Sequence, residues 1–173
     1  MKSSAGSPIL VSYSAIDSSI GTLHLAATDQ GLVRVAFASS SADEVRAGLV
    51  TAIGDVVFVT DDRLDRSTQQ ITEFLKHQRT EFDLELDLRL ARGFRREVLI
   101  HMRSIPFGQT RSYGQLAADL NHPGAARAVG TACASNPLVL VIPCHRVVRA
   151  DGSIGEYGGG AATKKSLLAM EAS

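Results

Sequence analysis

Residues 112–135 read SYGQLAADLNHPGAARAVGTACAS. Leu116 and Leu120 are at helical spacing, and the Pro-Gly break at residues 122–124 separates their predicted helix from a second one over residues 125–135. Two short helices joined by a turn that contains glycine are typical of a helix-turn-helix. Because helical hairpins are also common in ordinary cores, this pattern predicts the local fold but not the function.

The second predicted helix is built almost entirely from small residues, and Arg127 is the long side chain of its exposed part. A helix that reads the major groove presents several long polar side chains to the base edges. A smooth helix instead lets its backbone approach a partner closely, and a lone arginine on it can enter a base stack or pair with a phosphate. Tight packing inside the domain is the alternative that this composition leaves open. The small residues are Ala125, Ala126, Ala128, Gly130, Thr131, Ala132, Ala134 and Ser135.

Residues 138–142 form a continuous apolar run, typical of a buried strand, which leads into Pro143-Cys144-His145-Arg146. A thiol is a weak nucleophile until it ionises, and cationic neighbours favour the thiolate. His145 is placed to take the proton, and Arg146 to favour the negative charge. Adjacent side chains on a strand face opposite ways, so the chain must turn between Cys144 and His145. A small buried hydrophobe is the alternative role for Cys144.

The rest of the C-terminal half is predicted to be helix, hairpin, loop and helix. The glycine run after Tyr157 lacks the spacing of a phosphate-binding loop, so we interpret it as a pocket wall. Glu171 shares a helix face with core leucines, which suggests that it holds an imidazole; a solvated helix end is the alternative. The predicted elements are a helix from Phe94 to about Ser104, a hairpin around Asp151-Gly152 and a final helix from about Ala161.

The N-terminal half is predicted to be a small α/β scaffold. Two apolar segments flank the turn Asp29-Gln30-Gly31, which indicates a small antiparallel sheet. Ser41 and Glu44 have the pattern of a capping box at the start of a helix. His24 and His77 are isolated, so no zinc site is expected. The predicted elements are strands over 9–16, 21–36, 55–60 and 82–88, and helices over 41–53 and 64–77.

The net charge of zero conceals two oppositely charged halves. Residues 1–87 carry 7 Lys and Arg against 13 Asp and Glu, whereas residues 88–173 carry 11 against 5. This asymmetry predicts two domains, with a polyanion as partner of the basic one, although the halves could simply attract each other. The two cysteines and the polar N-terminus indicate a cytoplasmic protein without a membrane span.

Together these elements closely resemble the O6-alkylguanine-DNA alkyltransferases, also called methylated-DNA–protein-cysteine methyltransferases. The resemblance is strongest over residues 90–171. It implies a ribonuclease H-like α/β N-terminal domain over residues 1–88, and a mainly α C-terminal domain over residues 89–173 with a winged helix-turn-helix that binds DNA. The matching motifs are residues 105–113 (IPFGQTRSY), 126–130 (ARAVG), Asn136-Pro137, 142–148 (IPCHRVV) and 155–157 (GEY), followed by Gly159, Lys164, Leu167-Leu168 and Glu171.

The resemblance implies that Cys144 accepts the alkyl group of O6-alkylguanine, and of O4-alkylthymine if that lesion is also repaired. His145 would be its base, linked to Glu171 through a bound water, and Asn136 would hold the turn before the cysteine. Each molecule would react once, without a metal or other cofactor. A non-catalytic lesion sensor of the same fold and a cysteine hydrolase are the alternatives; such sensors replace the acceptor cysteine, and adjacent Cys-His order is unlike that of hydrolases.

The partner implied by the resemblance is double-stranded DNA that contains alkylated guanine, bound by a monomer with cooperative assembly left open. Arg127 would fill the gap left by the extruded base, and Tyr113 would press on the neighbouring phosphate. The other expected minor-groove residues are Thr110, Ser112, Ala126, Ala128 and Gly130. The expected pocket for the flipped base consists of Tyr157, Gly158, Gly159, Val147, Val139 and Met102, with Glu156 beside it.

Overall fold

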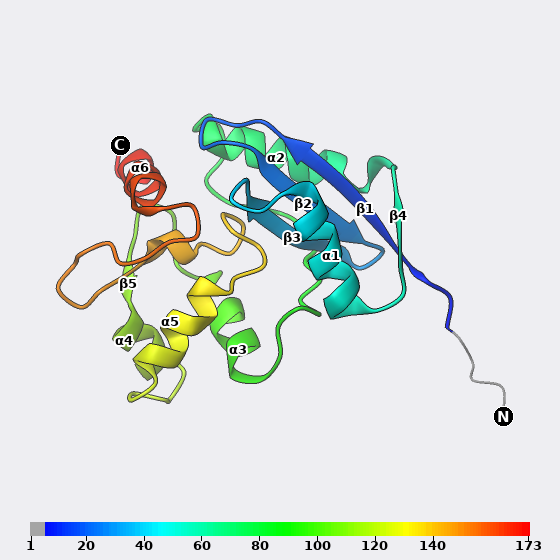
Figure 1. Ribbon diagram of the computed structural model, residues 1–173. Helices are drawn as coiled ribbons and strands as arrows, with labels where there is room; N and C mark the ends of the chain where they lie inside the picture. Colours follow the sequence, from blue (N-terminus) through cyan, green and yellow to red (C-terminus); the bar gives the residue numbers. More distant parts are fainter. Residues whose placement is uncertain (1–5) are drawn as a thin grey trace, which may run out of the picture.

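A computed structural model describes residues 6–173 and begins with a four-stranded sheet (Figure 1). Its strands are β1 (Ile9–Ile16), β2 (Leu23–Thr28), β3 (Gly31–Phe37) and β4 (Val56–Val59), in the order β3-β2-β1-β4. The predicted antiparallel pairing is confirmed for β1, β2 and β3. The strand predicted over residues 55–60 is β4, which pairs in parallel with β1 because a helix carries the chain across the sheet after β3, so the sheet is mixed.

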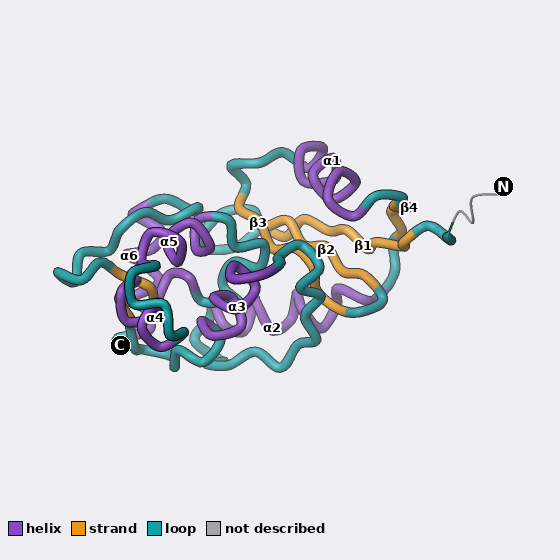
Figure 2. Tube along the Cα trace, turned by 90° about the horizontal axis from the view of Figure 1, so that it is seen from below, coloured by secondary structure: helices purple, strands orange, loops and turns teal. Residues whose placement is uncertain are grey.

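That crossover helix is α1 (Ala42–Ile53), and its predicted capping box is confirmed. Ser41 Oγ accepts a hydrogen bond from the Glu44 amide at 3.2 Å, and the Glu44 carboxylate accepts one from the Ser41 amide at 2.6 Å. The predicted second helix is α2 (Asp65–Leu75), which follows a 3₁₀ turn, η1 (Asp62–Leu64). Figure 2 shows α1 and α2 on opposite faces of the sheet.

The two faces of the sheet belong to two hydrophobic cores. On one face Val45 and Leu49 of α1 pack with apolar residues of β1, β2 and β3. On the other face Ile71 and Phe74 of α2 belong to a larger core that continues through the C-terminal half. Phe74 is fully buried, and it lies against both Phe82 and Phe107. The scaffold half and the cysteine-bearing half therefore share one core.

The predicted strand over residues 82–88 is wrong as a regular strand. This segment makes a single bridge to β3, in which Leu32 donates to Glu85 and accepts from Asp87, both at 2.9 Å. Farther along the same edge of β3, Val35 donates to the carbonyl oxygen of Pro137 at 2.8 Å. Since two segments of chain divide one strand edge between them, neither can pair along its length.

The C-terminal half is mainly helical, as predicted. Its helices are α3 (Gly93–Met102), α4 (Tyr113–Asp119), α5 (Ala126–Ala134) and α6 (Ala161–Glu171), with two short parallel strands, β5 (Arg111–Ser112) and β6 (Val147–Val148). Ser112 caps α4 in a second capping box with Gln115. The pair α4–α5 forms the predicted helix-turn-helix. No helix within residues 6–173 is long and apolar enough to cross a membrane.

Two further strand predictions are wrong in this half. Residues 138–142 are buried as expected, but they form consecutive turns, with Leu140 at φ +70° and Ile142 donating to the Leu138 carbonyl at 2.9 Å. An apolar run predicts burial, and only Leu138 reaches a strand edge. The turn at Asp151-Gly152 exists, but the predicted hairpin does not, because β6 pairs with β5 instead.

We expect Gly31→Ala to destabilise the sheet more than Gly21→Ala. Both glycines have positive φ, +130° and +97°, so both substitutions strain the backbone. A Cβ at Gly31 would also lie 2.4 Å from the Glu85 carbonyl oxygen, whereas one at Gly21 would meet nothing within 4 Å. Because of this clash, Gly31→Ala should lower the free energy of unfolding, measured with urea, by about 1–3 kcal/mol more than Gly21→Ala does. Equal losses for the two variants would contradict the close approach of residue 85 to β3.

Candidate active site

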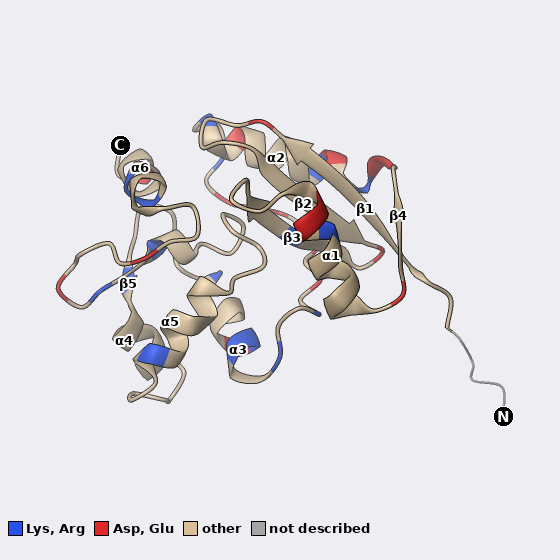
Figure 3. Cartoon of the chain, viewed as in Figure 1, with Lys and Arg blue, Asp and Glu red and all other residues tan. Residues whose placement is uncertain are grey.

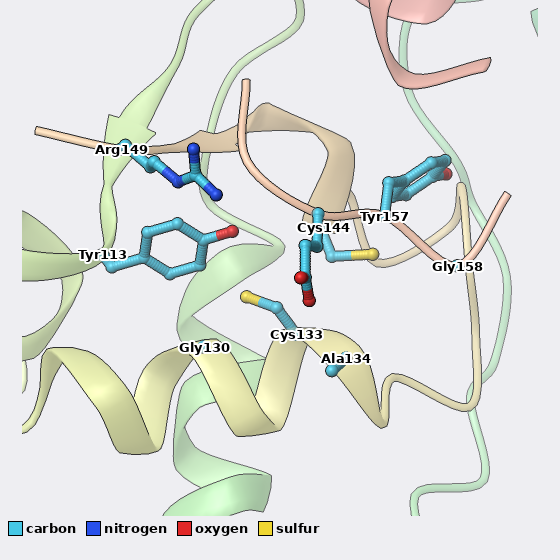
Figure 4. A pocket seen from close by; sticks show the side chains of 9 residues that line it. Tyr113, Gly130, Cys133, Ala134, Cys144, Arg149, Tyr157 and Gly158 are labelled. Carbon is cyan, nitrogen blue, oxygen red and sulfur yellow. The ribbon is translucent and has the colours of Figure 1, made fainter. Parts of the chain in front are cut away.

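A cavity of about 390 Å³ lies between α5, the cysteine turn and the loop before α6 (Figure 4). Tyr113 from the start of α4 closes one side of it, and Tyr157 lies on the far side. Its lining is both apolar and ionisable, a combination that suits a ligand pocket. The lining residues are Tyr113, Gly130, Cys133, Ala134, Cys144, Arg149, Glu156, Tyr157 and Gly158.

Cys144 reaches this cavity from a 3₁₀ turn, η2 (Cys144–Arg146), so the turn that the sequence requires after Cys144 is present. The Asn136 amide holds the approach to it by donating to the Ile142 carbonyl at 2.9 Å and to Cys144 Sγ at 3.2 Å. Its oxygen accepts from the Leu138 amide at 2.9 Å. One buried asparagine thus fixes the consecutive turns that replace the predicted strand.

Burial raises the pKa of the Cys144 thiol, even though the hydrogen bond from Asn136 and the charge of Lys164 oppose this effect. A thiol with a raised pKa is almost entirely protonated at neutral pH. Cys144 is 4% exposed, so solvent reaches it poorly. The resting site therefore holds a neutral thiol, and its nucleophilic form requires a base within the protein.

His145 is the base nearest to Cys144 in the chain, and a carboxylate fixes its tautomer. Its Nε2 lies 2.7 Å from Glu171 Oε1, so the predicted link through a water is corrected to a direct contact. Burial lowers the pKa of His145, which is consistent with a neutral ring. With its proton on Nε2 toward Glu171, Nδ1 carries the lone pair. Nδ1 is buried and has no hydrogen-bond partner within residues 6–173.

The sequence suggested that Arg146 favours the negative charge of the cysteine, but in the structure Arg146 binds Glu171. Its Nε donates to Glu171 Oε2 at 2.9 Å, and a terminal nitrogen donates to Oε1 at 3.0 Å. The other terminal nitrogen donates to the Ile105 carbonyl at 2.6 Å, and the Gly108 amide donates to Glu171 Oε2 at 3.1 Å. Burial alone would raise the pKa of Glu171, but the donors from His145 and Arg146 lower it to about 2.

Lys164 supplies the positive charge that favours the Cys144 thiolate. It is fully buried in α6, and its Nζ donates to the Val147 carbonyl at 2.5 Å and to the Glu156 carbonyl at 3.4 Å. These bonds tie the segment after the cysteine turn to the loop that carries Tyr157. The residue types alone gave Lys164 no role, because a lysine on a helix is usually solvated.

The structure brings part of the predicted base pocket together. Tyr157 and Gly158 line the cavity; the Tyr157 hydroxyl is buried without a hydrogen-bond partner in residues 6–173, and burial raises its pKa well above 10. Gly159 instead faces Phe37 of β3, whose ring lies 5.4 Å from that of Tyr157. Three predicted members are buried but do not line the cavity: Val147, Val139 and Met102.

A second thiol, Cys133, lines the same cavity and was not predicted. Its Sγ donates to Met102 Sδ at 3.5 Å, and burial raises its pKa to about 12. It therefore remains protonated and is a poor competitor as a nucleophile. Arg149 also lines the cavity without having been predicted, whereas Glu156 lies there as expected. No group of three or more His, Cys, Asp or Glu side chains in residues 6–173 is arranged to hold a metal ion.

Comparison with known proteins supplies the family. Residues 11–88 match the ribonuclease-like domain of 6-O-methylguanine DNA methyltransferase, and residues 93–173 match its DNA binding domain. A methylated-DNA–protein-cysteine methyltransferase of Mycolicibacterium paratuberculosis is 38% identical over 94% of this chain and 93% of its own length. The chain belongs to the methylated-DNA–protein-cysteine methyltransferase family.

Solved structures of this family share the whole fold. The O6-methylguanine methyltransferase of Mycobacterium tuberculosis is 36% identical, with a TM-score of 0.80 over 94% of this chain and 93% of that one. A crystal structure of the Mycobacterium tuberculosis protein OGT in complex with DNA is 34% identical, with a TM-score of 0.79 over 94% and 92%. The two-domain architecture expected for the methyltransferase family is thus confirmed.

Of the residues expected to face DNA, Tyr113 and Gly130 line the cavity, and most of the others lie on or next to the helix-turn-helix. Arg127 and Ala128 on α5 and Thr110 before α4 are exposed, and the basic position on α5 is visible in Figure 3. Ala126, Gly130, Ser112 and Tyr113 are half-buried. The Tyr113 ring lies in van der Waals range of the space above Gly130, so a larger residue there would meet the tyrosine. At Gly130, therefore, the small residue of α5 allows close packing against Tyr113.

We expect Glu171→Gln to remove a large part of the acid sensitivity of folding. Because the folded pKa of Glu171 is about 2 and its ordinary value is 4.5, its contribution is complete above pH 4.5 and is lost as the pH falls toward 2. This contribution is on the order of 3 kcal/mol. The free energy of unfolding of the variant should also be lower by about 3–5 kcal/mol at neutral pH, because Arg146 is left buried without its ion-pair partner.

Urea unfolding at several pH values between 7 and 2 measures both effects. Glu97→Gln, at an exposed position on α3, is the control and should keep the acid sensitivity of the wild type. A Glu171→Gln variant whose stability falls with acid as steeply as that of the wild type would contradict the assignment.

Proposed function

We propose that the protein repairs alkylated DNA by transferring the alkyl group from O6 of guanine to Sγ of Cys144. The observation that carries this proposal is the arrangement at the cavity. A buried thiol lines it, and the neighbouring histidine is held by Glu171 with Nδ1 free to accept a proton. Membership of a family whose relatives are named methylated-DNA–protein-cysteine methyltransferases supports the same reaction.

The proposed reaction is a displacement at the alkyl carbon. His145 takes the proton of Cys144, the sulfur forms a bond to the carbon, and the bond from carbon to O6 breaks. The electron pair stays on guanine, which becomes neutral by accepting a proton from the Tyr157 hydroxyl. The proton that His145 took then passes to the Tyr157 oxygen, and the centroids of the two rings lie 6.4 Å apart. The net result is the transfer of the thiol proton to guanine. Burial raises the pKa of Tyr157, so its hydroxyl is protonated at rest and gives up its proton only because the proton on His145 replaces it. Lys164 and Asn136 stabilise the sulfur while it is negative.

The product of this step is a thioether, which offers water no leaving group. Each molecule therefore reacts once, as a single-turnover transferase that is consumed by its own product. The chemistry needs no metal or organic cofactor. O4-alkylthymine has the same bond between an alkyl carbon and a base oxygen, and we include it as a second substrate.

Base flipping follows from where Cys144 lies. An atom inside a stacked duplex cannot reach a buried sulfur, so the target nucleotide must leave the stack. The cavity of about 390 Å³ falls within the ordinary range of pockets that enclose small ligands. Tyr157 and Gly158 are positioned to hold the base there. Val147, Val139, Met102 and Gly159 would then act by supporting the wall from behind.

The proposed partner is double-stranded DNA, which the match of residues 93–173 to a DNA binding domain supports. We place α5 in the minor groove because its small residues let the backbone come close, with Arg127 in the gap left by the flipped base. Tyr113 would contact the adjacent phosphate. We further propose that residues 1–88 and 89–173 are the two domains and that the protein is a monomer when it is not bound to DNA. We also propose that it works in a reducing compartment such as the cytoplasm, since both cysteines are free thiols.

The decisive experiment is intact mass spectrometry after mixing the protein with a duplex that contains O6-methylguanine. We expect one methyl increment per molecule, located on Cys144, and none in Cys144→Ser. Cys133→Ala is the matched control for the second thiol and should transfer normally, because Cys133 is protonated. Tight lesion binding without any increment would instead identify a non-catalytic sensor, and repeated turnover would identify a hydrolase.

Arg127→Ala should slow alkyl transfer more than it weakens binding to undamaged duplex. We expect a loss of transfer rate of at least about tenfold, because the flipped state loses the side chain that occupies the gap. One phosphate contact changes duplex affinity much less. Single-turnover rates and fluorescence anisotropy measure the two effects, with Arg103→Ala, an exposed arginine at the end of α3, as control. Equal losses in both would contradict a role in the stack.

A further inference from the structure

A smaller cavity of about 240 Å³ lies on the other side of the domain boundary, between α1, β3 and the start of α3. Two arginines line it: Arg34 from β3 and Arg95 from α3. Ser40 and Gly48 also border it, and the apolar side of α1 forms its floor. Figure 3 shows basic positions on α3 and on the connector before it, and acidic positions at the start of α1.

These two arginines share their cavity with one acidic side chain, Glu44. Neither forms an ion pair within residues 6–173. Arg95 donates one hydrogen bond, to the Ser135 carbonyl, and its Nε is buried without a partner. The Arg34 side chain makes no hydrogen bond in this part of the chain. Apart from the bond to Ser135, no hydrogen bond or ion pair occupies either guanidinium within residues 6–173.

Both burial and a second positive charge disfavour the charged form of Arg34. Burial lowers the pKa of Arg34, and the positive charge of Arg95 lowers it further. Glu44 also borders the cavity, but its carboxylate accepts from the Ser41 amide at 2.6 Å in the capping box of α1. An ordinary surface would separate two such arginines or pair each with a carboxylate.

We propose that Arg34 and Arg95 form a phosphate-binding site separate from the alkyl-transfer cavity. Guanidinium forks match the oxygens of a phosphate group, and charge-assisted hydrogen bonds of this kind are strong. The cavity is smaller than pockets that enclose a nucleotide, so it takes a single phosphate group. That group comes either from a backbone phosphodiester of bound DNA or from free phosphate. The site does not depend on Cys144 or on the proposed transfer reaction.

The first test uses the wild-type protein with inorganic phosphate as the probe. We expect the unfolding temperature to rise with phosphate along a saturable curve, at constant ionic strength maintained with chloride, because a ligand that binds the folded state stabilises it. Isothermal titration calorimetry should give one site per chain. A phosphate response that matches chloride at equal ionic strength would overturn the proposal.

Variants locate the site. Arg34→Gln and Arg95→Gln should each weaken phosphate binding by at least about tenfold, because the remaining guanidinium binds alone. Arg96→Gln, at an exposed position one residue along α3, should bind as the wild type does. In phosphate-free buffer Arg34→Gln should unfold at the same or a higher temperature than the wild type, since it removes a repulsion. Equal phosphate binding by all three variants would overturn the site.

Duplex binding distinguishes the two sources of phosphate. If the site takes a DNA phosphodiester, Arg34→Gln should weaken the affinity for undamaged duplex and lower the slope of log affinity against log salt by about 1. If it takes free phosphate, duplex affinity should match that of Arg96→Gln while the thermal response to phosphate is lost. These readouts do not involve alkyl transfer. The phosphate-site proposal can therefore be contradicted while the proposed repair reaction stands, and the repair reaction can be contradicted while the phosphate site stands.

Discussion

The buried carboxylate of Glu171 is the constraint on which the site depends. It lies at the C-terminal end of α6, where burial and the helix dipole both disfavour a negative charge. Arg146, the Gly108 amide and the His145 ring offset this cost together. Three segments far apart in the sequence thereby meet at one group. Removing Arg146 would leave the carboxylate without its ion pair in the core, and each other donor adds a contact to it, so the end of α6, the cysteine turn and the loop at residue 108 hold their places as a unit.

This unit also determines how the histidine can act. Because Glu171 takes the Nε2 side of the ring, the lone pair of a neutral His145 is on Nδ1. The same burial that keeps the ring neutral keeps the Cys144 thiol protonated. A site at rest therefore holds base and nucleophile uncharged. In the proposed reaction, charge appears only when sulfur attacks carbon, next to Lys164 and Asn136, which limits reaction of the thiol with other electrophiles.

Local sequence signals predicted local structure well. The capping box predicted at Ser41 is present, because it is decided by two neighbours three residues apart. The box that Ser112 forms with Gln115 was not predicted, although it follows the same spacing. The strands predicted over 82–88 and 138–142 fail for a tertiary reason, since both compete for the edge of β3. In the site, Cys133 could have been found: it follows Gly130 by three residues on one helix, so the two share a face. Phe37 could not, because only the folded sheet brings it to Tyr157.

That contact gives the N-terminal half a part in the chemistry that its sequence does not suggest. The Phe37 ring occupies the space that a side chain at residue 159 would need, with ring atoms 2.8 to 3.0 Å from a hypothetical Cβ there. Glycine at 159 therefore lets β3 press directly against the loop that carries Tyr157. The orientation of the proposed proton donor depends on how the sheet packs against the helical half. In this sense the acidic half is more than a scaffold, because Phe37 at the end of β3 supports one wall of the cavity.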